Sequence, residues 1–351
     1  MEEREQVHKR RKRYSGTHPK TFAEKYKEQN PEKYQDTIEK VIRKGSTPAG
    51  MHISIMVQEI LDVLKIQPGE QGLDATLGYG GHTKAMLECL QGRGHIYALD
   101  VDPIESKKTK QRLADKGYGE QILTIRQMNF ANIAQLSEEV GKFDFVLADL
   151  GVSSMQIDNP ERGFTYKAEG PLDLRLNPEQ GTPAYERLNE VTEEELIGML
   201  QENSDEPYAV EIAAKVTDWK RKKRAVHTTT DFKNVIEEAL GFVPQAERKE
   251  AVKKSCQRCF QALRIDVNSE FEVLYEFLEK LPDVLAPGGK VAILTFHSGE
   301  DRLVKKSFKT LKKQGIYQEI SEDVIRPSKE ECIKNPRARS TKMRWAVRAM
   351  E

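Results

Sequence analysis

Short hydrophobic runs alternate with amphipathic segments along most of the chain after residue 52. These runs are rich in β-branched and aromatic residues, as is typical of buried strands. Five of them predict strands: GLDATLG, HIYALDVD, ILTIRQMNF, FDFVLADLGV and KVAILTFHS. A last strand is expected in MRWAVRAM, and another around YQEISEDVI. Strands that alternate with helices build βαβ units, so the pattern predicts an α/β fold with a doubly wound, mainly parallel sheet.

A stretch of more than a hundred residues between the fourth and fifth strands breaks this alternation. It contains helical patterns such as TEEELIGMLQE, YAVEIAAKVTDWKRKK and TTTDFKNVIEEAL. We therefore expect an α-helical domain inserted into the α/β domain. The predicted division is a basic, polar N-terminal extension (1–48), the first part of the α/β core (49–170), the inserted domain (171–262) and the second part of the core (263–351).

The chain has 56 basic and 56 acidic residues, so its net charge indicates no particular partner. The basic residues are nevertheless unevenly distributed. Lys9–Arg13 and Lys220–Arg224 are uninterrupted basic runs, and basic residues outnumber acidic ones between Arg302 and Arg348. A single run is most simply explained as a solvated helix face. Three runs together favour a polyanionic partner such as nucleic acid.

Composition excludes several classes of protein. No apolar stretch reaches the roughly 18–20 residues of a membrane span, and the charged start MEEREQVHKRRKRY is unlike a secretory signal. Four cysteines in 351 residues are too few for a disulfide scaffold. Cys256 and Cys259 form a lone CxxC pair in a helical-looking stretch, so we expect reduced cysteines in a cytoplasmic protein rather than a zinc site. We also predict that the chemistry needs no metal.

A glycine-rich turn follows the first predicted strand and opens a helix. Gly78, Gly80 and Gly81 lie in DATLGYGGHT, where a backbone without Cβ atoms can approach a ligand. Asp100 ends the second strand, where a carboxylate can accept hydrogen bonds from both ribose hydroxyls. These features predict a nucleoside-containing cofactor, either NAD or S-adenosylmethionine (SAM). The missing third glycine of GxGxxG, and Asp149 at the end of the fourth strand, favour SAM.

Longer motifs follow one another in a single order: LGYGGHT, ALDVDP, MNF, DLGVSSMQID, RGFTY, GPLDLR, FQALRIDVN, GGKVAILTFHSGEDRLVK and NPRARSTKMR. Over residues 52–351 the chain resembles the MraW/RsmH family. The resemblance implies a class I SAM-dependent methyltransferase with a Rossmann-like doubly wound sheet and an inserted helical domain. It further implies that the enzyme methylates N4 of a cytosine in the decoding region of bacterial 16S ribosomal RNA, with the small ribosomal subunit as partner.

The same resemblance implies a set of cofactor-binding residues. Asp100 would hold the ribose of SAM, and Phe130 would lie beside the adenine. The remaining positions implied in the SAM pocket are Gly80, Gly81, His82, Asp149 and Gln156.

Three positions depart from the usual family pattern: Ser54 replaces a proline, Gly299 a leucine and Asp266 an alanine. They leave the identity of the target base open. A related SAM-dependent methyltransferase that acts on another RNA or DNA site therefore stays an alternative, as does a non-catalytic RNA-binding assembly factor.

Four residues are candidates for the chemistry. Asp149 ends a strand facing the methyl donor, so it is the first candidate for a proton acceptor, although ground-state SAM binding is an equally good role. Ser153 and Ser154 can accept a hydrogen bond from the amino group or cap a helix. His297 can orient the substrate or relay a proton, or simply bond to a loop. A proton acceptor contributes about 10²–10⁴-fold to the rate.

A base within folded RNA must leave its stack to reach the donor, so the protein needs an aromatic platform and contacts to phosphates. Each candidate also has a structural alternative, namely core packing for an aromatic ring and pairing with a carboxylate for an arginine. The candidates are Phe164, Tyr166, Arg175, Arg264, Arg337 and Arg339. The inserted helical domain is expected to clamp the RNA. The sequence leaves both a monomer and a homodimer open.

Overall fold

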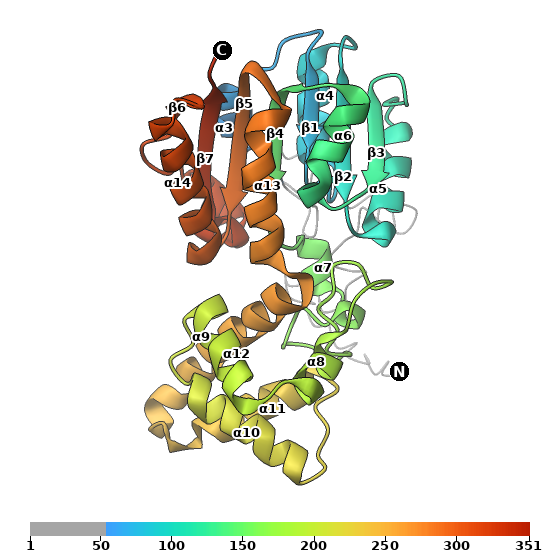
Figure 1. Ribbon diagram of the computed structural model, residues 1–351. Coiled ribbons are helices and arrows are strands. Elements are labelled where there is room, and N and C mark those ends of the chain that lie inside the picture. Colours follow the sequence, from blue (N-terminus) through green and yellow to red (C-terminus); the bar gives the residue numbers. More distant parts are fainter. Residues whose placement is uncertain (1–53) are drawn as a thin grey trace, which may run out of the picture. The chain divides into compact units, whose positions relative to one another are not determined.

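A seven-stranded sheet organises the part of the chain that the structure describes, residues 54–351 of a computed structural model (Figure 1). Predictions for the N-terminal extension, including the run Lys9–Arg13, lie outside the described residues. The strands are β1 (Gln71–Asp74), β2 (His95–Asp100), β3 (Leu123–Gln127), β4 (Phe143–Asp149), β5 (Leu285–Thr295), β6 (Tyr317–Ile320) and β7 (Lys342–Arg348).

The strands lie in the order β3-β2-β1-β4-β5-β7-β6. Strands β1 to β5 are parallel, whereas β7 runs antiparallel to both of its neighbours, β5 and β6. The chain order reverses at β1, which pairs with β2 on one side and β4 on the other. Open α/β sheets bind ligands at such a switch point. The predicted α/β fold with its doubly wound, mainly parallel sheet is confirmed, including the two strands expected near the C-terminal end of the sequence.

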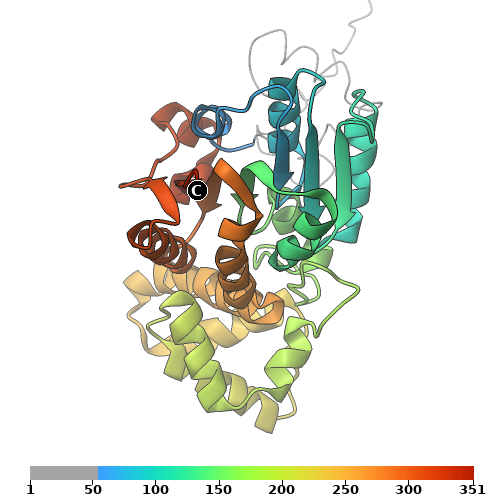
Figure 2. The same ribbon diagram turned by 45° about the horizontal axis from the view of Figure 1, so that its top comes forward.

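Helices cover both faces of this sheet. Helices α6, α13 and α14 bury one apolar cluster against it, and α3, α4 and α5 bury another on the opposite face. Figures 1 and 2 show α13 and α6 on the near face. Because both faces are covered, the strands are apolar at most positions rather than alternating. The bounds are α3 (Val57–Leu64), α4 (Gly81–Leu90), α5 (Pro103–Ala114), α6 (Ile133–Val140), α13 (Glu270–Val284) and α14 (Ser298–Lys313).

Five further helices form a separate apolar cluster beyond the end of β4 (Figure 1). Capping boxes at Thr192 and Thr228 begin α9 and α11, because each hydroxyl accepts an amide hydrogen that the helix leaves free. The long α12 continues through the predicted boundary at residue 262, and Phe164, which precedes residue 171, packs in this cluster. The proposed domain limits therefore stay a prediction. The helices are α8 (Ala184–Glu190), α9 (Glu193–Ser204), α10 (Ala209–Arg221), α11 (Thr229–Ala239) and α12 (Gln245–Asn268).

Several strands differ in length from their prediction. The strands β1, β3 and β4 end at Asp74, Gln127 and Asp149, so the glycine-rich, MNF and DLGVSS motifs lie in the loops and short helices that follow. Strand β5 begins earlier than expected, at Leu285. Within residues 54–351, no helix has the length and apolar composition of a membrane span. The short helices are α7 (Ser154–Asp158), α15 (Lys329–Lys334), η2 (Phe130–Asn132), η3 (Pro160–Arg162), η4 (Leu240–Phe242) and η5 (Pro336–Ser340).

The CxxC pair lies inside α12, as predicted. Cys256 and Cys259 are fully buried and form no disulfide, whereas Cys89 and Cys332 are free and partly exposed. Burial raises the pKa of Cys256 to about 12 and raises that of Cys259 as well. Neither thiol therefore presents a reactive thiolate.

We expect Cys89 and Cys332 to react first with a charged thiol reagent in native buffer, and all four thiols to react in denaturant. The absorbance released from DTNB measures both rates. A variant carrying Cys89→Ser and Cys332→Ser should show no fast-reacting thiol while it is folded. Rapid reaction of that variant in native buffer would contradict the packing described for α12.

Candidate active site

Four carboxyl groups gather at the edge of the sheet where the parallel strands end. Asp74, Asp100 and Asp149 are the last residues of β1, β2 and β4, and Glu300 lies in the first turn of α14, after β5. The charges of Asp74 and Glu300 both raise the pKa of Asp149, so these groups lie within electrostatic reach of one another. This edge includes the switch point between β1 and β4.

Backbone amides hold the carboxylate of Asp100. The amide of Gly78 donates to its Oδ2 and the amide of Asp102 to its Oδ1, each at 2.9 Å. Burial raises the pKa of Asp100 to about 7, although both hydrogen bonds favour the ionised form. The glycine-rich loop and the end of β2 therefore meet at this one carboxyl group, and its contact with a ribose stays a prediction.

The glycines of the turn are required for different reasons. Gly78 has φ +47°. A Cβ at this position would meet only Thr76 O, at 3.8 Å, so the space beside Gly78 is not filled by protein atoms of the described residues. Gly80 has φ +81°, and its Cβ would lie 2.7 Å from the Thr109 side chain. At Gly81 a Cβ would overlap Ser54 Oγ. Packing within the protein thus explains Gly80 and Gly81, whereas open space for a ligand is found at Gly78.

His82 and Asp149 form a pair across the site. His82 Nδ1 lies 3.5 Å from Asp149 Oδ2, and His82 Nε2 lies 2.8 Å from the carbonyl oxygen of Ile55. A carbonyl only accepts, so Nε2 carries a hydrogen and donates it. The contact between Nδ1 and Oδ2 is an ion pair when His82 is protonated.

The second oxygen of Asp149 has no partner among the described residues. Its Oδ1 is buried and accepts no hydrogen bond from any described residue. Burial raises the pKa of Asp149 to about 6, with His82 opposing that rise. A buried acceptor without a donor is costly, so this atom fits a ligand that brings a donor. The cofactor implied by the family resemblance has such donors in its amino and hydroxyl groups.

Two other expected cofactor residues lie at the same edge. Phe130 begins η2 just after β3, and its ring packs edge-on against Phe277 with centroids 5.1 Å apart. Gln156 is buried in α7, where its side-chain oxygen accepts from the Ser153 amide and its Nε2 donates to Asp102. The side chains of Gln156 and Phe130 thus both contact other parts of the protein. Their contacts with the cofactor stay a prediction.

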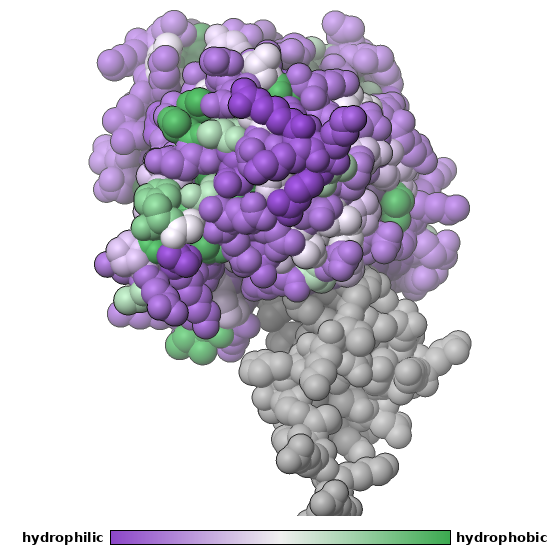
Figure 3. Space-filling model, turned by 90° about the horizontal axis from the view of Figure 1, so that it is seen from below, coloured by the Kyte–Doolittle hydropathy of each residue, from purple (hydrophilic) through white to green (hydrophobic). Residues whose placement is uncertain are grey.

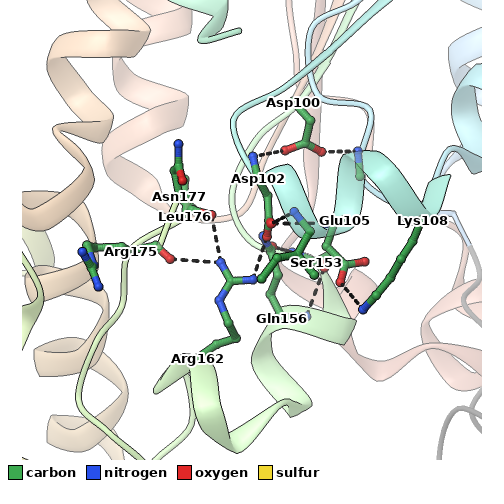
Figure 4. A network of polar contacts seen from close by, with 12 residues as sticks. Asp100, Asp102, Glu105, Lys108, Ser153, Gln156, Arg162, Arg175, Leu176 and Asn177 are labelled. Carbon is green, nitrogen blue, oxygen red and sulfur yellow. Dashed lines mark hydrogen bonds and ion pairs between the residues drawn. The ribbon is translucent and has the colours of Figure 1, made fainter. Parts of the chain in front are cut away.

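A buried ion pair beside these residues was not predicted. Arg162 Nη1 donates to Asp102 Oδ2 at 2.7 Å, and both side chains are almost entirely buried (Figure 4). Removing one partner of such a pair costs about 3–5 kcal/mol. In the sequence, Asp102 is the second acid of ALDVDP and Arg162 is the first residue of RGFTY. Neither motif alone indicates that these two side chains pair. Thr83, which donates to Asp74 Oδ2 at 2.6 Å, was also missed.

The proposed proton-relay candidates occupy helix starts. Ser153 caps α7, since its hydroxyl accepts from the Gln156 amide, and Ser154 is the first residue of that helix. His297 is the N-cap of α14, and its Nε2 lies 3.2 Å from Glu300 Oε1. The helix cap named as the alternative for Ser153 is therefore present, whereas His297 contacts an acid of α14 rather than a loop. The catalytic roles of all three residues stay predictions.

His297 also belongs to a group of possible metal ligands. Donor atoms of Glu270, His297 and Glu300 lie within 4.8 Å of one another. Arg264, however, donates to both carboxylate oxygens of Glu270, at 2.8 and 2.9 Å. A guanidinium in this position already supplies the positive charge that a metal ion would bring.

The RNA-contact candidates fall into three groups. Phe164 and Tyr166 pack with the helical cluster, Phe164 being only 9% exposed. Arg175, Arg264 and Arg337 pair with Asp173, Glu270 and Asp158. Arg339 is exposed in η5. Five of the six residues therefore have the alternative role expected for them, core packing for the rings and carboxylate pairing for the arginines, and Arg339 is the exception. The contacts of all six with RNA stay predictions.

The surface seen in Figure 3 is mostly hydrophilic, with small, separate hydrophobic patches. In the run Lys220–Arg224, Lys222 pairs with Asp218, and Arg224 pairs with Glu238 and stacks on Trp219 at 3.5 Å. These contacts fit a solvated run that extends past the end of α10, and a role of the run in binding nucleic acid stays a prediction.

Sequence comparison finds close relatives over almost the whole chain. A sequence model of the MraW methylase family matches residues 49–349. A ribosomal RNA small subunit methyltransferase H 1 from Lachnoclostridium phytofermentans is 68% identical over 348 residues, covering 99% of this chain and 95% of that protein. The corresponding protein from Agathobacter rectalis is 66% identical over 345 residues, covering 98% and 99%.

Comparison with solved structures finds more distant similarity. A putative rRNA-methylase from Clostridium thermocellum has a TM-score of 0.41 and 11% identity, with coverage of 86% of this chain and 99% of that chain. A putative methyltransferase from Streptococcus mutans in complex with SAH has a TM-score of 0.37 and 12% identity, with coverage of 85% and 99%.

The contact between Gly81 and Ser54 gives a test of the site's geometry. Gly81→Ala should lower the free energy of unfolding by about 1–3 kcal/mol, because the new methyl group overlaps Ser54 Oγ. Adding Ser54→Ala should recover part of the loss. Gly198→Ala in α9 is the control, since nothing lies within 4 Å of its Cβ and alanine favours a helix. Urea denaturation measures all four proteins, and equal stability of Gly81→Ala and the wild type would contradict the contact.

Proposed function

Because this chain belongs to the MraW methylase family, we propose that it transfers a methyl group from SAM to N4 of a cytosine in the decoding region of 16S ribosomal RNA. The observation that carries this proposal is the family match over residues 49–349. It is supported by relatives named ribosomal RNA small subunit methyltransferase at 66–68% identity. Asp100 and Asp149 end the two strands that flank β1, and the glycine-rich turn follows β1, an arrangement that supports the proposal.

The residues present fit SAM. Asp100 would accept hydrogen bonds from the ribose, Gly78–His82 would border the cofactor, and Phe130 would lie beside its adenine. Asp149 Oδ1 supplies a buried acceptor without a partner among the described residues. When bound, SAM supplies an electrophilic methyl group on a sulfonium.

Orientation is the largest contribution that the protein can make. Cytosine N4 is a weak nucleophile because its lone pair is delocalised into the ring. Holding it in line with the methyl group is worth up to about 7–11 kcal/mol. The base must be extruded from its stack to reach the edge of the sheet, and we propose that the helical cluster beyond β4 holds the surrounding RNA.

Asp149 is our candidate for the group that accepts the amino proton. With a pKa of about 6, its carboxyl is largely ionised at neutral pH, yet it is basic enough to take up a proton. His82 favours the ionised form, because its charge lowers the pKa of Asp149. The Ser153 hydroxyl oxygen accepts from the Gln156 amide and, with its second lone pair, can also accept from the cytosine amino group.

The partner and the location that we propose follow from this function. A small ribosomal subunit is the substrate particle, and we propose a cytoplasmic location because the subunit is found there. We propose that Arg339 contacts RNA phosphates, as do Arg175, Arg264 and Arg337, which pair with carboxylates in the unbound protein.

Transfer of label from SAM tests the function and the role of Asp149 together. Small subunits that lack the modification should acquire a methyl group on N4 of the decoding-region cytosine. Asp149→Asn should lower kcat by about 10²–10⁴-fold with little change in the KM for SAM, because the asparagine oxygen can still accept a hydrogen bond from the cofactor but is not a base. Asp144→Asn is the matched control, because Asp144 lies at the other end of β4 and accepts from the Gln71 amide.

Other outcomes of this assay reject specific parts of the proposal. A raised KM for SAM with normal kcat in Asp149→Asn would make Asp149 a cofactor ligand only. Label in another RNA or in DNA would identify a related methyltransferase with a different target. A wild-type chain that neither binds SAM nor transfers label would be a non-catalytic assembly factor.

Cofactor binding should depend on the ionisation of Asp100. Ribose hydroxyls donate to the ionised carboxylate, whose pKa is about 7, so affinity falls as the pH falls through that value. The Kd of SAH should be about tenfold weaker at pH 6 than at pH 8, as a single competing proton requires. Calorimetry measures this change, which Asp100→Asn should largely remove. An unchanged Kd between pH 6 and 8 in the wild type would contradict the role of Asp100.

The same shift has the opposite effect on the unliganded fold. The pKa of Asp100 is raised from 3.8 to about 7 in the folded protein. The unfolded chain therefore releases this proton first, and the contribution of Asp100 to stability is lost as the pH rises between these values.

A further inference from the structure

Arg162 connects the cofactor side of the site to the segment that leads into the helical cluster (Figure 4). Its guanidinium is buried, and Nη1 donates to Asp102 Oδ2 at 2.7 Å. Its Nη2 donates to the carbonyl oxygens of Arg175 and Leu176, at 3.1 and 2.8 Å. One side chain thus holds two parts of the chain that are distant in sequence.

On the cofactor side, the buried pair fixes the position of Asp100. The backbone amide of Asp102 is one of the two donors to the Asp100 carboxylate. The Asp102 side chain accepts from Arg162 and Gln156 through Oδ2, and caps α5 through Oδ1. A shift of Arg162 therefore moves Asp102, and with it one of the two donors to Asp100.

On the other side, Arg162 holds a strained segment. Leu174 is buried with φ +64°, a conformation that L side chains rarely adopt and that persists only when the surroundings impose it. Its amide donates to the Arg162 carbonyl oxygen at 3.2 Å. Asn268, at the end of α12, donates to Leu174 O and accepts from the Leu176 amide. The segment is thus clamped between Arg162 and α12.

We propose that Arg162 is a positioning residue that couples SAM binding to RNA binding. Order in the Asp100–Asp102 loop and order in the segment Asp173–Leu176 reinforce each other through its guanidinium. The inference rests on the proposed function, in which Asp100 holds the ribose and Arg175 lies on the RNA side. Coupling of two sites is reciprocal, so RNA tightens SAM binding by the same factor by which SAM tightens RNA binding.

Equilibrium dialysis with labelled SAH, with and without small subunits that lack the modification, measures this coupling. In the wild type, subunits should tighten SAH binding by about fivefold or more. Arg162→Lys keeps the charge but loses the planar fork that reaches both sides, so the factor should fall to near one. Its kcat/KM should fall by about 10²-fold through misplacement of the reacting groups.

Arg344→Lys is the matched control. Arg344 is also a buried arginine paired with an aspartate, since its Nε donates to Asp301 at 2.7 Å, but it lies on β7. Both variants should lose thermal stability, whereas Arg344→Lys should keep the wild-type coupling factor. Where Arg162→Lys does not fold, the double variant Asp102→Asn with Arg162→Gln removes both buried charges and should show the same loss of coupling.

The outcomes separate this inference from the function on which it rests. Coupling that survives in Arg162→Lys or in the double variant, or that is absent in the wild type while SAH still binds, overturns the inference alone. Equal loss in Arg344→Lys overturns it too, because the effect then reports stability. A wild-type protein that does not bind SAH contradicts the proposed function and the inference together.

Discussion

The cost of burying carboxyl groups at one edge of the sheet governs the arrangement of the site. An ionised carboxylate removed from water needs hydrogen bonds or a cation in place of the water. Asp100 obtains two backbone amides, Asp102 obtains Arg162, and Asp74 obtains Thr83. Asp149 is different, because one of its oxygens is buried without a donor among the described residues. The edge is therefore incomplete where a ligand is expected.

The same need for partners ties the helical cluster to the sheet. Asp102 draws Arg162 into the interior, and Arg162 in turn satisfies two carbonyl groups of the segment before α8. A buried guanidinium with several donors can serve both sides at once, which a single-point cation cannot do. The geometry of the cofactor loops and that of the helical cluster are consequently not independent.

The family departures are accommodated around the site rather than within its hydrogen bonds. Ser54 lies against Gly81, and a Cβ on Gly299 would lie 2.6 Å from the Phe271 ring, so that ring occupies the space a side chain at 299 would need. Asp266 pairs with Arg187 at 2.9 Å. None of the three donates to or accepts from Asp100 or Asp149 in the described structure, which is consistent with an unchanged cofactor site.

Local pattern determined the alternating strands and helices, the interruption after β4 and the acids at the strand ends, because periodicity, glycine and chain order act over short distances. It also placed the CxxC pair on a helix. Tertiary structure decided which polar groups meet: Asp102 with Arg162, His82 with Asp149, and Gln156 with Asp102. These partners are up to 67 positions apart in the chain. Burial selects among many possible donors at that separation, and only the packed fold fixes which carboxylate oxygen is left without one.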